Sequence, residues 1–261
     1  MRFAASVEYE GTNFSGWQRQ SSVNSIQMEL EDSLSQIIQG KITIQGAGRT
    51  DAGVHALGQV FHFDTNIERP NHSLIKGVNS FLPNTIRVNW IKTVSDEFHA
   101  RFSVTSREYQ YLLNSSPINS SIWSNHCGWT FYKLNSLLIK AASKKFIGTH
   151  DFSAFRSSEC QAKSPIRSIK SVKVEEFSNF YLFTINGDGF LHHQIRNMIA
   201  TIINVGRNEM DLDYIDTLFK KKDRSLTPAT FSPNGLYLTN IKYDKIWGFP
   251  DKLNTVNIFR V

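Results

Sequence analysis

The chain has 261 residues, a formal net charge of +6 and a sequence pI near 9.3. Its 40% apolar and 12% aromatic residues exclude a disordered chain and suffice for one large or two modest domains. No apolar run is long enough to span a bilayer, and the first ten residues, MRFAASVEYE, lack the apolar core of a signal peptide.

Strands and helices are predicted to alternate in the first 105 residues. Hydrophobic periodicity predicts helices at residues 26–38 and 74–82, and strands at residues 3–9, 42–45, 60–64 and 86–90. Asn24 is expected to cap the first helix and Gly40 to end it, whereas Pro83 stops the second.

The same pattern begins again at Ser106. Helices are predicted at residues 134–142, 192–205 and from Asp211 or Asp213 to Phe219, and strands at residues 109–111, 169–177, 180–186 and 236–243. Alternating strand faces favour an α+β fold with a mainly antiparallel sheet flanked by helices. Because each half contains one β-α-β order, we expect two similar subdomains, residues 1–105 and 106–261.

Familiar cofactor motifs are missing from the sequence. Cys127 and Cys160 form no CxxC motif, and the eight histidines show no spacing typical of a zinc site. A GxGxxG fingerprint begins at Gly46 but has Asp51 at its third glycine position, where a carboxylate would repel a pyrophosphate. No metal or cofactor is therefore expected, and the low cysteine content is typical of the reducing cytoplasm.

The loop at residues 46–59, GAGRTDAGVHALGQ, places Arg49 and Asp51 among small residues. Glycine lets the backbone approach a ligand closely. A neighbouring guanidinium would keep a buried carboxylate charged, as a nucleophile or base requires. This combination indicates a prepared catalytic site; the alternative is a tight turn with a surface ion pair.

Three further segments combine basic, aromatic and amide side chains suited to RNA. Residues 9–20 offer aromatic rings and amides, residues 98–111 interleave cations with rings, and residues 192–197 open a predicted helix. Each also has an ordinary explanation, namely an anchored loop, an amphipathic strand and a boundary arginine. The candidate RNA-contacting residues are Gln18, Arg101, Arg107, Tyr109, His192 and Arg196.

Together, these segments resemble the tRNA pseudouridine synthases of the A family (tRNA pseudouridine synthase I, the anticodon stem-loop type). The matching motifs follow one another in the family's order and cover nearly the whole chain: YEGTNFSGWQRQ, GAGRTDAGVHALGQV, FHARFSVTSREYQY, GTHDFSAF, HHQIRN and NGLYL. The resemblance implies the pseudouridine synthase fold, in which two α+β halves share a central antiparallel sheet.

The resemblance also implies an activity. Uridines at positions 38, 39 and 40 of the anticodon stem-loop of tRNA would become pseudouridine, without metal or cofactor. Similar enzymes are homodimers with the tRNA lying across both subunits. Two alternatives stay open: a non-catalytic tRNA-binding or folding protein, and a pseudouridine synthase acting at another RNA site.

Site residues follow from the matched motifs. Asp51 falls on the catalytic aspartate of the family, and Arg49 and Arg196 fall on active-site arginines. Tyr109 falls on the tyrosine that stacks on the target base, and Leu236 in NGLYL falls at a position suited to the base pocket.

Flipping the uridine out of its stack costs a few kcal/mol. Phosphate contacts from Arg101, Arg107 and residues 220–224 would offset that cost.

Overall fold

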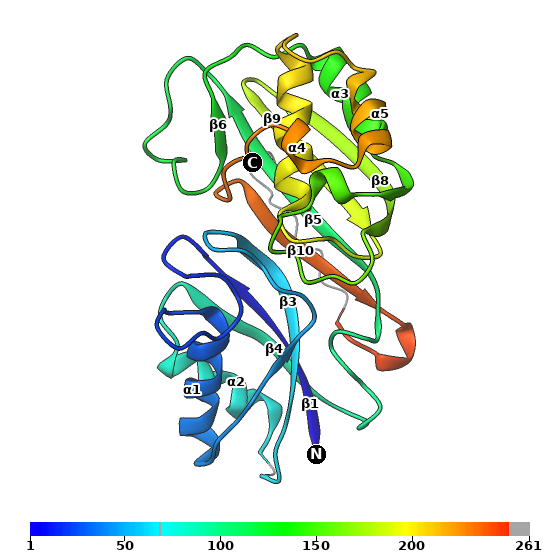
Figure 1. The fold of residues 1–261 in the computed structure, drawn as a ribbon. Coiled ribbons are helices and arrows are strands. Elements are labelled where there is room, and N and C mark those ends of the chain that lie inside the picture. The colour runs from blue at the N-terminus through cyan, green and yellow to red at the C-terminus, as the bar shows by residue number, and fades with distance from the viewer. Residues whose placement is uncertain (68, 251–261) are drawn as a thin grey trace. The chain divides into compact units, whose positions relative to one another are not determined.

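The computed structural model of the chain describes residues 1–67 and 69–250 (Figure 1). The chain forms two compact units. Within the described residues, unit 1 comprises residues 1–67, 69–107 and 237–250, and unit 2 comprises Glu108–Leu236. The sequence-based division placed residues 106–261 together, but the last strand returns to unit 1; residues 251–261 lie outside the described part.

Unit 1 is built on a sheet whose strands follow the order β4-β1-β3-β10, with β2 beside β3. β1 pairs antiparallel with both β3 and β4, whereas β10 runs parallel to β3 where Tyr237 faces His55. This parallel pairing brings the chain's last strand back to unit 1. The strands are β1 (Arg2–Tyr9), β2 (Gln45–Gly46), β3 (His55–Asp64), β4 (Ile86–Val94) and β10 (Leu236–Tyr243).

Two helices pack within unit 1, α1 (Ile26–Ile38) and α2 (Asn71–Phe81) (Figure 1). Ser25, rather than the expected Asn24, caps α1, because its hydroxyl accepts a hydrogen bond from the Met28 amide. The helix ends at Gln39, which adopts the left-handed conformation one residue before the expected Gly40.

The core of unit 1 is rich in aromatic rings. The Phe3 and Phe63 rings stack with centroids 5.4 Å apart, and both are buried. Trp17 is only 2% exposed and packs near Phe61, with ring centroids 6.4 Å apart. This aromatic core supports the end of the sheet from which residues 47–54 emerge.

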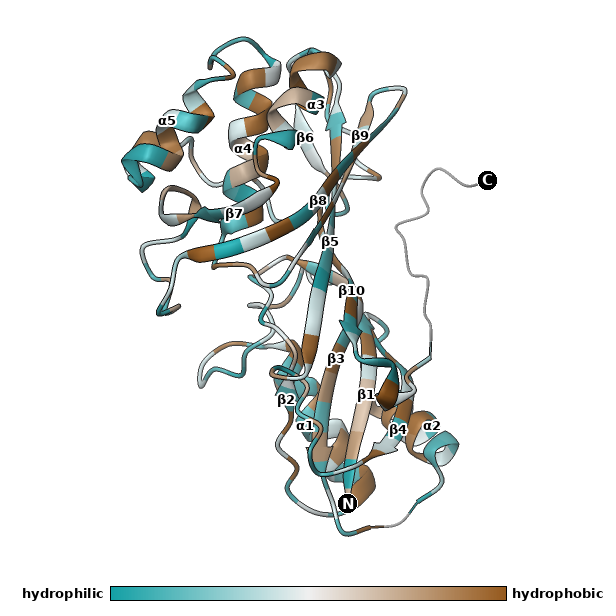
Figure 2. Ribbon diagram, turned by 90° about the vertical axis from the view of Figure 1, so that its right-hand side faces the viewer, coloured by the Kyte–Doolittle hydropathy of each residue, from teal (hydrophilic) through white to brown (hydrophobic). Residues whose placement is uncertain are grey.

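The strands of unit 2 follow the order β5-β9-β8-β7, with β6 beside β5. The pairs β7–β8 and β8–β9 are antiparallel, and β6 is parallel to β5. Hydrophobic and hydrophilic residues alternate along β8 (Figure 2), as expected for a strand with one face toward solvent. The strands are β5 (Val104–Ser115), β6 (Gly128–Thr130), β7 (Gly148–Asp151), β8 (Ile166–Phe177) and β9 (Phe180–Gly187).

Three helices belong to unit 2: α3 (Ser136–Lys144), α4 (Gln194–Gly206) and α5 (Tyr214–Lys221). α3 packs against α4 and β8, and α4 is buried along most of its length. The α+β class predicted from the sequence, with mainly antiparallel strands flanked by helices, is confirmed. Within residues 1–67 and 69–250, no helix is both long and apolar enough to cross a membrane.

Candidate active site

The Arg49–Asp51 segment lies in unit 1, on the connection between β2 and β3. Thr50 is buried, Asp51 is half-buried and Arg49 is exposed. The structure therefore sets the Asp51 carboxylate at the boundary between core and solvent. A group in this position can meet a substrate while its backbone is held by the protein.

Residues 9–17 hold one side of this segment. The Trp17 amide donates a hydrogen bond to the Thr50 carbonyl at 3.0 Å, and the Gly53 amide donates one to the Phe14 carbonyl at 3.3 Å. The hydroxyl groups of Tyr9 and Thr50 lie 2.8 Å apart. These contacts bracket Asp51 on both sides along the chain.

Gly16 makes this close approach possible. Its φ is +88°, a conformation that favours glycine, and a Cβ atom there would lie 2.5 Å from the Thr50 carbonyl oxygen. The two segments therefore meet backbone to backbone. No larger residue fits at position 16 without moving the loop that carries Asp51.

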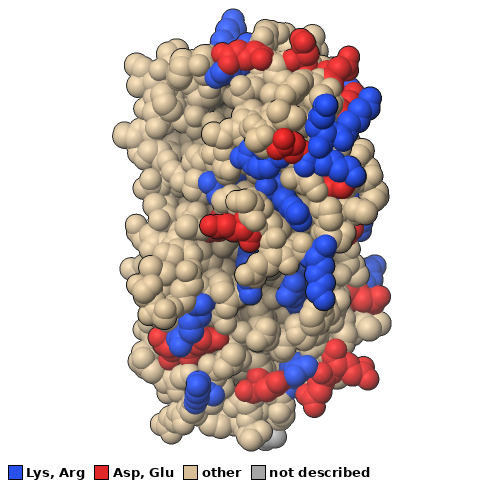
Figure 3. All heavy atoms as spheres, viewed as in Figure 1, with Lys and Arg blue, Asp and Glu red and all other residues tan. Residues whose placement is uncertain are grey.

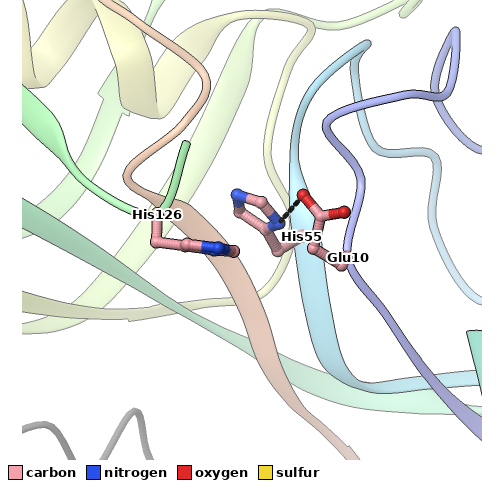
Figure 4. A group of neighbouring side chains, drawn as sticks. All are labelled: Glu10, His55 and His126. Carbon is pink, nitrogen blue, oxygen red and sulfur yellow. Dashed lines mark ion pairs between the residues drawn. The ribbon is translucent and has the colours of Figure 1, made fainter. Parts of the chain in front are cut away.

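His55 secures the other end of the same loop. It is 1% exposed, and its Nδ1 accepts a hydrogen bond from the Gly11 amide at 3.1 Å. Figure 4 shows the His55 ring beside the Glu10 carboxylate, with Nδ1 3.9 Å from Oε1. The Tyr237 ring stacks on His55 with centroids 4.7 Å apart. The sequence reasoning gave His55 no role, although it follows Asp51 by four positions in a matched motif.

Two polar side chains also support residues 47 and 48. The Arg107 Nη2 donates a hydrogen bond to the Ala47 carbonyl at 2.8 Å, and the Gln59 amide donates one to the Gly48 carbonyl at 2.7 Å. Arg107 was expected to bind a phosphate. In the structure, its guanidinium also holds the backbone of the catalytic-loop candidate.

The ion pair expected between Arg49 and Asp51 stays a prediction. Arg49 points to solvent, where hydration competes with pairing to a carboxylate. Of the other unit 1 candidates, Arg101 is exposed, and the Gln18 amide donates to Gln27 Oε1 at 2.8 Å. Gln18 lines a polar hollow of about 400 Å³ beside α1.

The remaining candidates belong to unit 2. Tyr109 lies on β5, is 7% exposed and meets the Phe190 ring edge-on with centroids 5.1 Å apart. Arg196, on the first turn of α4, donates through Nε to the Phe231 carbonyl at 2.8 Å. Leu236 is buried at the start of β10. Tyr109 and Arg196 are thus each held by contacts within unit 2.

The start of α4 differs from the predicted one. The helix begins at Gln194 rather than His192, because His193 has a φ of +64° and interrupts the helical conformation. His192 is half-buried, and its ring lies beside that of His193 with centroids 4.0 Å apart. His192 therefore precedes the helix.

The segment from Lys220 to Arg224 was expected to bind phosphates. The Arg224 guanidinium donates to Asn197 Oδ1 and Thr230 Oγ1, each at 3.1 Å, and phosphate binding by this segment stays a prediction. Burial lowers the pKa of this guanidinium. Lysines do gather at the end of α5, where Lys220 and Lys221 form the last turn, and Figure 3 shows a concentration of basic side chains in that part of unit 2.

Comparisons with known proteins agree on one family. The model of a family described as tRNA pseudouridine synthase matches residues 5–103 and 142–244. The chain is 43% identical over 260 residues to tRNA pseudouridine synthase A of Nitrosomonas eutropha, covering 100% of this chain and 92% of the relative. It is 42% identical over 250 residues to tRNA pseudouridine synthase A of Methylobacillus flagellatus, covering 96% of each.

Among solved structures, a Cbf5-Nop10-Gar1 complex aligns with 90% of this chain and 57% of the matched chain. The TM-score is 0.38 and the sequence identity is 13%, too low to support any structural argument.

Proposed function

Because the chain belongs to the tRNA pseudouridine synthase family, we propose that it converts uridine to pseudouridine at positions 38–40 of the anticodon stem-loop of tRNA, with Asp51 as the essential catalytic residue. The enzyme is an isomerase. The single observation that carries the role of Asp51 is its setting: a half-buried carboxylate whose neighbours on both sides are fixed by hydrogen bonds.

The reaction requires the N1–C1′ bond of uridine to break, the base to turn, and C5 to join C1′. The proton leaves C5 and N1 gains one, so the atoms balance without an outside reactant. Asp51 either attacks C6 or C1′, or abstracts the 2′ proton of the sugar. All three routes need an ionised carboxylate placed against the nucleoside.

Four other residues are proposed to contact or support the reacting nucleotide. Tyr109 stacks on the uracil ring and accepts the C5 proton, while Leu236 contributes an apolar wall to the base pocket. Arg49 pairs with Asp51 when RNA excludes water from the loop. Arg196 adds a second positive charge. The contacts that hold the Tyr109 and Arg196 side chains support these roles, because the side chains would lose little conformational entropy when RNA binds.

Phosphate binding is proposed for Arg101 and Arg107, with Gln18 and His192 as further substrate contacts. The exposed Arg101 is free of the burial that limits Arg224. We also propose that the enzyme is a homodimer in the cytoplasm, as the family resemblance implies. The formal charge of +6 supports an RNA partner.

The direct test is the change Asp51→Asn, which keeps the shape of the side chain and removes its charge. The purified variant is incubated with tRNA, and pseudouridine is mapped by carbodiimide labelling. We expect no labelled product, with tRNA binding retained. Asp211→Asn, an exposed aspartate of unit 2, is the matched control and keeps full activity.

Other outcomes identify the alternatives. Normal turnover by Asp51→Asn would overturn the catalytic role. Labelling outside positions 38–40 would identify a synthase for another RNA site. If the wild-type protein binds tRNA and labels none of it, the non-catalytic tRNA-binding alternative holds.

A further inference from the structure

The loop between β4 and β5 exposes one aromatic ring to solvent. Phe102 is 76% exposed, whereas Phe98 in the same loop is 0% exposed and packs into the core of unit 1. The matched motif therefore contains one buried and one exposed phenylalanine. An exposed phenyl ring contributes little hydrophobic free energy to folding, but its burial against a bound partner would stabilise the complex.

The backbone around Phe102 is fixed by hydrogen bonds. The amides of Arg101 and Phe102 both donate to His99 Nδ1, at 3.1 and 3.4 Å. The Ser103 amide donates to the His99 carbonyl at 2.9 Å, and the His99 amide donates to Ser103 Oγ at 3.1 Å. A ring on such a loop loses little conformational entropy when a ligand stacks on it.

Ala100, which follows His99 in this loop, is also anchored by hydrogen bonds. The Ala100 amide donates to His62 Nδ1 at 3.2 Å, and the Tyr243 hydroxyl donates to the Ala100 carbonyl at 2.7 Å. Both partners come from strands of unit 1, β3 and β10. The loop is thus fastened to the sheet rather than only to itself.

Two side chains, those of His99 and Arg101, lie next to the Phe102 ring. The His99 ring packs against it with centroids 4.3 Å apart and planes tilted by 33°. The Arg101 guanidinium carbon lies 5.7 Å from the ring centroid and is exposed. A supported ring beside an exposed cation is the combination that binds a base and its phosphate in single-stranded RNA.

Arg107 connects this loop to the one that carries Asp51. Its Nη2 donates to the Arg101 carbonyl at 3.4 Å and to the Ala47 carbonyl at 2.8 Å. The exposed ring and the proposed catalytic loop are therefore held by one guanidinium within unit 1. Residue 47 of the proposed catalytic loop and residue 101 of the Phe102 loop thus lie within reach of one guanidinium.

We propose that Phe102 is a stacking platform for an unpaired base of the RNA substrate, next to the target uridine along the strand, and that Arg101 binds the phosphate of that base. The inference rests on the proposed function for the identity of the RNA. Stacking on a phenyl ring tolerates any base, so the platform orients the strand without selecting its sequence.

The test compares aromatic and aliphatic replacements of Phe102. Single-turnover pseudouridine formation is measured over a range of enzyme concentrations with an anticodon stem-loop RNA. Phe102→Leu keeps apolar bulk but removes the aromatic face, so we expect half-saturation at about tenfold higher enzyme concentration. Phe102→Tyr and Phe102→Trp keep the face and the affinity.

Phe81→Leu is the matched control, because Phe81 is 51% exposed at the end of α2 in the same unit. It leaves half-saturation unchanged. A second readout places 2-aminopurine at one unpaired loop position at a time. We expect its fluorescence to be quenched at one position by the wild type and by Phe102→Trp, but not by Phe102→Leu.

Salt dependence separates the two parts of the platform. Arg101→Gln lowers the slope of log affinity against log salt by about one phosphate contact, whereas Phe102→Leu leaves the slope unchanged. Equal affinity for wild type and Phe102→Leu would overturn the proposal. Equal losses for Leu, Tyr and Trp would also overturn it, as would a change in sedimentation mass for Phe102→Leu, which would indicate a protein interface.

Failure of the platform and failure of the proposed function look different. If the wild type modifies the stem-loop and Phe102→Leu gives the same half-saturation and the same fluorescence, the stacking role of Phe102 is wrong but the proposed function is supported. If wild type modifies no RNA but still quenches 2-aminopurine through Phe102, the platform stands and the function falls.

Discussion

The hydroxyl groups of Tyr9 and Thr50 lie 2.8 Å apart in the interior of unit 1, and both residues are buried. Thr50 immediately precedes Asp51. The contact ties the last residue of β1 to the proposed catalytic loop, which is 41 positions away in the sequence. Together with the Trp17–Thr50 and Gly53–Phe14 backbone bonds, this contact helps to place the Asp51 carboxylate.

Removing that hydrogen bond is expected to lower the turnover number strongly and to affect substrate binding little. Thr50→Val and Tyr9→Phe each delete one hydroxyl while keeping the shape of the side chain. We expect kcat to fall about tenfold, because small displacements of a reacting group are costly. KM for tRNA should stay within about twofold, since both residues are buried.

The double variant distinguishes a shared bond from two separate effects. If Tyr9 and Thr50 act through one hydrogen bond, the double variant is no slower than either single variant. Tyr181→Phe, which removes a buried hydroxyl from unit 2, is the control for general loss of stability. A tenfold loss of kcat in that control, or additive losses in the double variant, would contradict the positioning role.

Gly16→Ala tests the close approach of the two backbones. A Cβ atom at position 16 would lie 2.5 Å from the Thr50 carbonyl oxygen, and the φ of +88° disfavours alanine. We expect the free energy of unfolding to fall by about 2 kcal/mol or more and activity to fall with it. Gly40→Ala is the control, because a Cβ there meets no atom within 4 Å. Urea denaturation and tRNA modification rates provide the measurements.

The regular elements of the fold could be predicted because their signals are local. The apolar stripe of α1 and the alternation of β1 are each readable within about ten residues. The short strands β6 and β7 were missed, since three or four residues show no period. The return of β10 to unit 1 depends on its pairing with β3, a contact between distant segments that no local pattern reveals.

The candidate site shows the same limit. Asp51 could be singled out from the composition of its loop and from the family resemblance. The support from His55 and Tyr9 could not, because both contacts join residues more than 40 positions apart. The sequence also predicted phosphate binding for Arg224, whose guanidinium the structure engages with Asn197 and Thr230. Charge alone does not distinguish a structural arginine from a binding one.

Arg107→Lys distinguishes a structural role of Arg107 from a phosphate-binding role. Lysine keeps the charge, but its shorter side chain does not place a donor at the position of Nη2, which contacts both the Ala47 and Arg101 carbonyls. We expect kcat to fall about tenfold while the salt dependence of tRNA binding stays the same. Equal kcat for the variant and wild type would assign Arg107 to phosphate binding alone. Lys76→Arg, on α2, is the control for a change between the two basic residues.

His62 makes the stability of unit 1 depend on pH. Burial lowers the pKa of its imidazole to about 4, and His99 and Arg2 nearby add to the effect, although Asp64 opposes it. Only the neutral ring can accept the hydrogen bond from the Ala100 amide at Nδ1. The folded chain therefore needs His62 unprotonated.

The sign of the effect follows from where the protons bind. In the unfolded chain the imidazole has its ordinary pKa near 6.5, so between pH 6.5 and about 4 the unfolded state binds more protons. The free energy of unfolding should fall by about 2–3 kcal/mol as the pH drops through this window. His62→Asn keeps an acceptor for the Ala100 amide and removes the titration, so its stability should fall less.

Urea denaturation at pH 7 and pH 4.5 measures the difference, with His72→Asn, an exposed histidine of α2, as the control. Part of the slope should persist in His62→Asn, because burial also lowers the pKa of His99 beside it. Parallel losses of stability in wild type and His62→Asn would show that protonation of His62 does not limit the fold. Because His62 anchors the loop that carries Phe102, RNA affinity should weaken at low pH in wild type before the chain unfolds.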